Sequence, residues 1–115
     1  MVKSFKGKKV LVMGLGLHGG ALSVVKWLLR HGAIITITDL KTKAQLKTSL
    51  EEISKLRGAK KIKYSLGGHD IADFIDQDLI IQNPAVPKNN KFLNKARQNN
   101  ISIVNEAVMF FGLYP

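Results

Sequence analysis

Short apolar runs alternate with longer amphipathic stretches along most of the chain. Runs of this kind, rich in Val, Ile and Leu, are typical of strands in a sheet. They predict five strands, at residues 10–13, 33–38, 61–64, 78–81 and 101–104. The segment 61–64 differs from the others, because lysines alternate there with Ile62 and Tyr64, as in a half-exposed strand.

The stretches between these runs have the spacing of helices. An apolar i, i+3, i+4, i+7 pattern predicts a helix over residues 18–31, with Trp27 on its flank and Gly32 as its C-cap. Two capping-box signatures, Thr42-x-x-Gln45 and Thr48-x-x-Glu51, predict that the next helix starts at one of them. Further helical stretches are predicted after the turn at 67–70, around 92–98 and, capped by Asn105, through 111.

This regular alternation of strand and helix predicts the fold class. Parallel strands joined by helices form a sheet that is covered on both faces. The chain is therefore expected to be one α/β domain over residues 1–115, with a Rossmann-like, doubly wound parallel sheet of about five strands and helices on both faces.

One turn carries the most chemical information. Gly14-Leu15-Gly16-Leu17-His18-Gly19 follows the first apolar run and opens the first helix, which is the arrangement of a phosphate-binding turn. Gly14 permits the sharp turn, Gly16 leaves room for a phosphate beside the backbone, and Gly19 lets the helix approach the strand. The N–H groups at the start of the helix attract an anion, so a bound diphosphate is predicted.

Other candidate residues follow the later strands. Asp39 ends the second strand, where an acidic side chain accepts a hydrogen bond from a ribose hydroxyl or a base, or else caps a turn. His18 faces the predicted phosphates, and Lys41 lies within reach of the same ligand. Gly67 follows the third strand, and the proline-rich loop that begins at Asn83 follows the fourth, at the edge where doubly wound sheets bind ligands.

Composition narrows the function classes. The chain has no cysteine and only three histidines, at no ligand-like spacing, so no disulfide and no metal site are expected. Its net charge of +10 comes from lysines spread over the whole chain without interleaved aromatic residues, which argues against nucleic acid as the partner. No signal peptide or membrane span is recognisable, so a cytoplasmic protein is predicted. No nucleophile with a base partner, carboxylate pair or Walker motif is visible, and the pattern favours a binding domain.

Several of these segments together resemble one family, the Mur ligases that add D-glutamate to UDP-N-acetylmuramoyl-L-alanine. The resemblance covers nearly the whole chain and rests on five segments in the same order and spacing. These are the Gly14–Gly19 turn, Asp39-Leu40-Lys41, Gly67-Gly68-His69, Asn83-Pro84-Ala85-Val86-Pro87 and the segment from Asn105 to Phe111.

The resemblance implies the N-terminal domain of a three-domain enzyme, which holds the UDP part of the substrate. The residues implied in UDP binding are Gly14, Gly16, Leu17, His18 and Gly19 at the diphosphate, Asp39, Leu40 and Lys41 around the uracil, and Gly67, Asn83, Pro84 and Ala85 near the sugar and base. Two positions depart from the family pattern: His18 stands where Ser or Thr is usual, and Ala85 stands where Gly is usual.

The resemblance also implies what the domain leaves to the rest of such an enzyme. ATP and magnesium would activate the substrate carboxylate as an acyl phosphate, which the amine of D-glutamate then attacks. Those cofactors and the catalytic residues would belong to the central and C-terminal domains. The chain stops at Pro115, about where the linker to the central domain would start. It is therefore expected to be an excised domain without catalytic activity or a cofactor of its own.

Three alternatives remain open on the sequence. The glycine turn and Asp39 also fit an NAD(H)-binding domain of a dehydrogenase or redox-sensing regulator. The related Mur ligase that adds L-alanine shares the UDP-sugar, although its glycine turn has a different pattern. A basic α/β module that binds nucleic acid would explain the charge but does not require the glycine turn.

Overall fold

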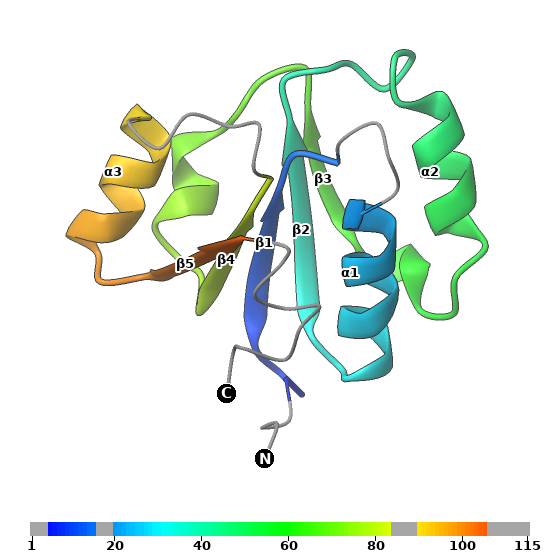
Figure 1. Cartoon of the computed structure of the whole chain (residues 1–115), viewed down its shortest axis with the longest axis horizontal. Helices are drawn as coiled ribbons and strands as arrows, with labels where there is room; N and C mark the ends of the chain where they lie inside the picture. The colour runs from blue at the N-terminus through cyan, green and yellow to red at the C-terminus, as the bar shows by residue number, and fades with distance from the viewer. Residues whose placement is uncertain (1–4, 16–19, 84–89, 106–115) are drawn as a thin grey trace.

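The computed structural model describes residues 5–15, 20–83 and 90–105. Within these residues the chain forms a five-stranded parallel sheet in the order β3-β2-β1-β4-β5, with helices on both faces (Figure 1). The strands are β1 (Lys9–Met13), β2 (Ile34–Asp39), β3 (Lys63–Leu66), β4 (Leu79–Gln82) and β5 (Ser102–Asn105). The helices are α1 (Gly20–Arg30), α2 (Lys47–Ser54) and α3 (Lys91–Gln98), with 3-10 turns η1 (Ala59–Lys61) and η2 (Ile71–Phe74). The predicted fold class is confirmed.

Alternation along β1 divides the core between the two faces of the sheet. Val10 and Val12 pack in the cluster that lies under α1 and α2, which also contains Leu28 and Ile53. Leu11 and Met13 point to the opposite face, in a smaller cluster with residues of η2 and α3. These four apolar side chains of β1 are at most 1% exposed, because this central strand is covered on both faces.

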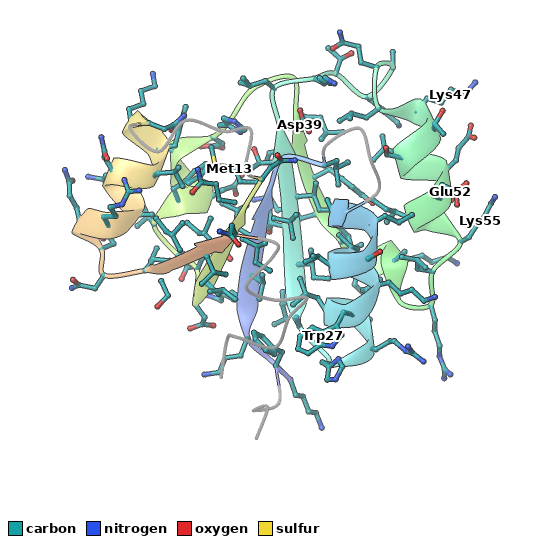
Figure 2. The ribbon with its side chains drawn as sticks, viewed as in Figure 1. Met13, Trp27, Asp39, Lys47, Glu52 and Lys55 are labelled. Atoms are coloured by element: carbon teal, nitrogen blue, oxygen red, sulfur yellow. The ribbon has the colours of Figure 1, made fainter. Side chains whose placement is uncertain are left out.

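The helix boundaries follow the predicted signals in most places. The first helix ends at Arg30, and Trp27 lies on its flank as predicted (Figure 2). The indole is edge-on to Phe5 and stacked on His31. Asn90 caps α3 by accepting a hydrogen bond from the N–H of Phe92. The short helical stretch predicted after residue 70 is the 3-10 turn η2. Asn105 is the last residue of β5, and the helix predicted beyond it lies outside the described residues.

The start of α2 differs from both capping-box predictions. The Thr42–Gln45 box does form, since the N–H of Thr42 donates to Gln45 Oε1 over 2.9 Å and the N–H of Gln45 donates to Thr42 Oγ1 over 3.3 Å. However, it closes a turn that precedes the helix. The helix itself begins at Lys47 without a side-chain cap, so Thr48 lies inside it and the second box is wrong as a start signal.

The third strand lies two residues later than predicted. Residues 59–61 form η1, which the N–H of Ile62 closes by donating to the carbonyl of Ala59, so pairing with β2 begins only at Lys63. Its register pairs Lys63 with Thr36 and Leu66 with Asp39. The apolar Ile62 follows that turn and is buried, but it precedes the first residue of the strand, which explains why the alternating pattern placed the strand too early.

None of the helices within the described ranges is long and apolar enough to cross a membrane.

Candidate functional site

The candidate residues that the structure describes gather at one edge of the sheet. Gly14 follows β1, Asp39 ends β2, Gly67 follows β3 and Asn83 follows β4. Because the strands are parallel, their carboxyl ends meet at the same edge, the one near which Met13 and Asp39 are labelled in Figure 2. This edge is where doubly wound sheets bind their ligands. The structure thus brings together four segments that lie far apart in the sequence.

Two features of the structure require glycine at position 14, the first glycine of the turn. Gly14 has a φ of +88°, which L side chains rarely adopt, and its N–H donates to the carbonyl of Thr38 over 2.8 Å. A Cβ at this position would lie 2.9 Å from the Cβ of Asn83, closer than real Cβ atoms approach. The predicted role of Gly14 in a sharp turn agrees with this geometry. Gly16, Leu17, His18 and Gly19 lie outside the described residues, so their predicted contacts stay predictions.

Asp39 directs its carboxylate into the protein. Oδ2 accepts a hydrogen bond of 2.9 Å from the N–H of Leu15, and Oδ1 accepts one of 2.9 Å from the N–H of Lys41. The residue is 8% exposed. Of the two roles open on the sequence, the turn-capping role is therefore present in the structure. It joins the start of the glycine turn to the segment that follows β2.

The two residues after Asp39 remain accessible. Leu40 is 70% exposed. Lys41 is partly buried, and its carbonyl accepts a hydrogen bond of 2.8 Å from the N–H of Gly67. An exposed leucine with a neighbouring cation is a suitable surface for the flat face of a nucleobase and an anionic group.

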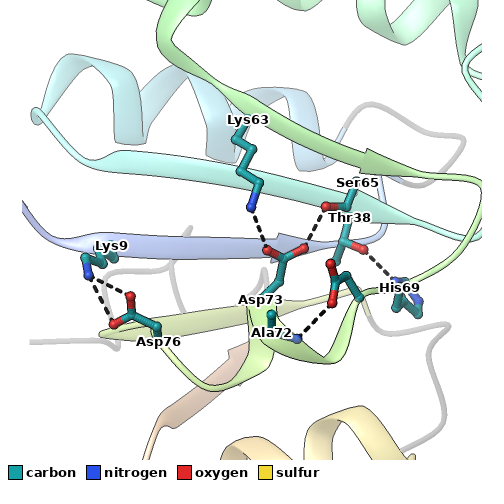
Figure 3. A network of polar contacts seen from close by, with 9 residues as sticks. Lys9, Thr38, Lys63, Ser65, His69, Ala72, Asp73 and Asp76 are labelled. Carbon is teal, nitrogen blue, oxygen red and sulfur yellow. Dashed lines mark hydrogen bonds and ion pairs between the residues drawn. The ribbon is translucent and has the colours of Figure 1, made fainter.

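The turn after β3 folds back onto the end of β2. Gly67 has a φ of +77° and Gly68 a φ of +147°, and Gly68 forms an isolated bridge with Asp39. Next to them, His69 Nδ1 lies 2.7 Å from Thr38 Oγ1 (Figure 3). The imidazole packs edge-on against Phe92. Burial lowers the pKa of His69, and the nearby carboxylates of Asp39 and Asp73 oppose that shift. The neutral imidazole is therefore favoured at this edge.

Sequence reasoning did not identify Thr38 or His69 as partners. A signal was available for Thr38, because threonines alternate with isoleucines over residues 35–38 and so place their hydroxyl groups on one face of β2. Thr38 is fully buried, and its hydroxyl needs a hydrogen-bond partner there. The identity of that partner, 31 residues further along the chain, is visible only in the structure.

The loop after β4 enters the site through its first residue. The N–H of Asn83 donates to the carbonyl of Met13 over 2.9 Å, which holds the loop against the end of β1. Pro84 and Ala85 lie outside the described residues, and so does the departure from the family pattern at Ala85. Over the described parts of the chain, no group of three or more His, Asp or Glu side chains is placed to hold a metal ion.

The sequence is similar to that of one known family. Residues 8–105 match the family model described as "Mur ligase MurD-like, N-terminal domain". The chain is 40% identical over 109 residues to the UDP-N-acetylmuramoylalanine--D-glutamate ligase of Roseiflexus sp., a match that covers 95% of the chain and 22% of the relative. It is 44% identical over 101 residues to the ligase of that name in Bdellovibrio bacteriovorus, covering 88% of the chain and 21% of the relative.

Similar solved structures support the fold. A pseudomurein peptide ligase type C from Methanothermus fervidus superposes with a TM-score of 0.64 at 24% identity, over 95% of this chain and 21% of that one. SirC, a precorrin-2 dehydrogenase, superposes with a TM-score of 0.55 at 20% identity, over 90% of this chain and 46% of that one. The chain spans about a fifth of the length of the curated relatives that it matches.

Proposed function

The chain belongs to the MurD-like N-terminal domain family of the Mur ligases, and from this premise we propose that it binds the UDP part of UDP-N-acetylmuramoyl-L-alanine. The observation that carries the proposal is the convergence of four strand ends on one edge, where Gly14, Asp39, Gly67 and Asn83 meet. In the proposed complex, the diphosphate lies on the glycine turn, including Gly16, Leu17, His18 and Gly19.

The base would lie on the other half of this edge. Leu40 offers an exposed apolar side chain, and Lys41 and Gly67 are joined by a backbone hydrogen bond that fixes their spacing. We assign the uracil to the surface between Leu40 and Gly67, and the sugar to the side of Asn83, Pro84 and Ala85. Backbone groups and an apolar side chain suit a planar, uncharged base, because they combine a contact surface with directional hydrogen bonds.

The activity of the whole protein is part of the proposal, since the chain spans only about a fifth of its relatives. We propose that the parent enzyme adds D-glutamate to UDP-N-acetylmuramoyl-L-alanine in peptidoglycan biosynthesis. ATP and magnesium would act in the central and C-terminal domains, at residues outside this chain. The parent enzyme would work in the cytoplasm, and the domain alone would contribute substrate binding without catalysis.

Calorimetric titration of the chain with UDP, NADH and a mixed-sequence oligonucleotide separates the classes left open by the sequence. The proposal expects saturable binding of UDP and no comparable binding of NADH or oligonucleotide. Binding of NADH without detectable binding of UDP would instead identify a dinucleotide-binding domain. Because a basic surface attracts any anion, the titrations are repeated in added salt, and tripolyphosphate serves as a control for charge alone.

A further inference from the structure

Exposed cations gather in the segment that joins α2 to β3. Between Glu52 and Asp70 the sequence contains no acidic residue. Exposed basic side chains in this segment form a group that we call the basic corner, namely Lys55, Arg57, Lys60 and Lys61. Within the described residues none of them forms an ion pair with a carboxylate, whereas the neighbouring Lys63 is paired with Asp73. The segment therefore carries a concentrated positive charge.

The helix dipole accounts for only part of this charge. Lys55 is the C-cap of α2, where the negative end of the helix dipole favours a cation. The other three cations lie beyond that helix, two of them in the short turn η1. The segment is held in place by the buried Ala59 and Ile62, not by contacts of its charged side chains. These cations consequently remain available to a partner.

The C-terminal end of α1 lies beside the basic corner. A Cβ at Gly58 would be 3.7 Å from Leu29 Cδ2, and the next residue of α1, Arg30, is exposed. In Figure 1, α2 and η1 stand at the margin of the molecule, on the side of the edge strand β3. The basic corner is therefore on the outside of the fold, with a further cation of α1 close by.

The basic corner and the proposed nucleotide site lie at opposite edges of the sheet. The turn η1 leads into the amino end of β3, whereas Gly67 follows the carboxyl end of that strand. Figure 2 shows the same separation along α2, with Lys47 toward the edge where Asp39 lies and Lys55 at the other end of the helix. A partner at the basic corner would therefore leave the carboxyl edge open.

The chemistry of the basic corner suits an extended anionic surface. No large apolar side chain of residues 55–61 is exposed, so the attraction is electrostatic. An extended surface can meet all four cations, whereas a small anion reaches only one or two of them. Residues 55–63 contain no aromatic side chain to stack on bases, which disfavours nucleic acid. Clusters of about four to eight Lys and Arg side chains are typical of surfaces that bind anionic phospholipids.

We propose that the basic corner is a docking surface for the anionic headgroups of a phospholipid bilayer. The four side chains contact lipid phosphate groups at the surface of the bilayer, without insertion of the chain into the hydrocarbon. Docking is reversible and is weakened by salt, because exposed charges are screened. The inference goes beyond the proposed function and does not depend on it.

Sedimentation with lipid vesicles tests the proposal. The chain is mixed with vesicles of phosphatidylglycerol and phosphatidylcholine in equal parts, with and without added salt, and with vesicles of phosphatidylcholine alone. The corner variant carries Arg57→Gln, Lys60→Gln and Lys61→Gln. The matched control has the same net charge but loses three exposed lysines elsewhere, through Lys43→Gln, Lys47→Gln and Lys91→Gln.

Docking through the basic corner predicts binding to the anionic vesicles that is absent with phosphatidylcholine and lost in added salt. Each cation near an anionic bilayer strengthens binding about fivefold. The corner variant should therefore need at least about tenfold more anionic lipid for half-maximal binding, and the control less than about threefold more. No binding of the wild type to anionic vesicles, or equal losses in the two variants, would overturn the inference.

A titration with a double-stranded oligonucleotide distinguishes the other class of anionic partner. The inference predicts that the oligonucleotide binds no more tightly than the anionic vesicles and that the corner variant and the control bind it alike. Tighter binding of the oligonucleotide, weakened in the corner variant alone, would assign this surface to nucleic acid and overturn the inference.

A measurement on the wild type locates the docking surface without any substitution. Amide NMR signals are recorded in the presence of anionic bicelles that contain a nitroxide-labelled lipid. The inference predicts the strongest paramagnetic broadening at Arg57, Gly58 and Lys61, and little at Gly67 and Asn83 at the opposite edge of the sheet. Broadening centred on the carboxyl edge, or spread evenly over the chain, would overturn the inference.

Discussion

A side chain at position 14 would collide with the side chain of Asn83. The distance from an ideal Cβ at Gly14 to the Cβ of Asn83 is 2.9 Å, and the N–H of Asn83 is bound to the carbonyl of Met13, the neighbour of Gly14. The end of β1 and the end of β4 are therefore in contact at the site. Neither can be changed without affecting the other.

Gly14→Ala is expected to lower the free energy of unfolding by about 3 kcal/mol, the sum of a left-handed backbone and a forced contact. Gly7→Ala is the matched control, because Gly7 has a similar φ of +76° but no atom within 4 Å of its would-be Cβ. The control is expected to lose only about 1–2 kcal/mol, the backbone part. Urea unfolding measures both, and equal losses would contradict the role of Asn83.

Asp73 is expected to be the most important carboxylate for the stability of the edge strand β3. It is 4% exposed and accepts hydrogen bonds from Ser65 Oγ over 2.7 Å and Lys63 Nζ over 3.2 Å (Figure 3). Asp73→Ala leaves the Ser65 hydroxyl without its acceptor and should cost about 2 kcal/mol.

The exposed pair of Lys9 and Asp76 is the comparison for Asp73. Asp76→Ala should change the free energy of unfolding by less than about 1 kcal/mol, because exposed ion pairs are screened by water. Thermal unfolding of Asp73→Ala and Asp76→Ala measures the loss of stability in each variant. If Asp76→Ala cost as much as Asp73→Ala, burial would not be the reason for the importance of Asp73.

The stability of the domain is expected to fall as the solution becomes mildly acidic. Burial lowers the pKa of His69 below its usual 6.5, against the opposing effect of Asp39 and Asp73, so the folded state favours the neutral ring. As the pH falls, His69 takes up a proton in the unfolded chain before it does so in the folded one. The stability that the neutral ring contributes is therefore full above pH 6.5 and is lost as the pH falls toward the pKa of the folded state. Replacing His69 by glutamine should remove this dependence of stability on pH.

Urea unfolding of wild type and His69→Gln at pH 7.5 and 5.5 measures that difference. The wild type should lose more stability than the variant between the two pH values, and an NMR titration should place the pKa of the His69 ring below 6.5. A ring that titrates above 6.5 would reverse the sign of the effect and contradict this explanation.

Leu40 is expected to matter for the ligand and not for the fold. Its side chain is 70% exposed, so Leu40→Ala should change the free energy of unfolding by less than about 0.5 kcal/mol. It should weaken UDP binding about threefold or more through lost apolar contact. Ile34→Ala is the control, since Ile34 is 55% exposed at the other end of β2 and should change neither quantity. Equal UDP affinity in wild type and Leu40→Ala would show that the uracil does not bind at this surface.

The sequence predicts the elements of this fold well because the strands are buried and their apolar runs are short and sharply bounded. It fails at β3, where Lys61 still belongs to a 3-10 turn, because the partner that fixes the register of Lys63, Thr36 in β2, lies 27 residues earlier (63 − 36). The pattern around residues 61–64 contains no information about that pairing.

The same limit applies to the site. The positions of Gly14, Asp39, Gly67 and Asn83 at one edge follow from the strand order of any doubly wound sheet. The direction of the Asp39 carboxylate does not, because its partner Leu15 N–H lies 24 residues earlier in the chain. The contact of His69 with Thr38 is likewise tertiary. Sequence therefore indicates which residues gather at the carboxyl edge of the sheet, whereas their individual contacts depend on packing.

The most direct test of UDP binding is an amide chemical-shift map of the chain during titration with UDP. Binding at the carboxyl edge of the sheet predicts the largest shifts at Leu15, Lys41, Gly67 and Asn83, with little change at Lys9 and Ser102 at the opposite end of their strands. Shifts concentrated at that opposite end, or none at saturating UDP, would contradict the account and remove the carboxyl edge as the nucleotide site.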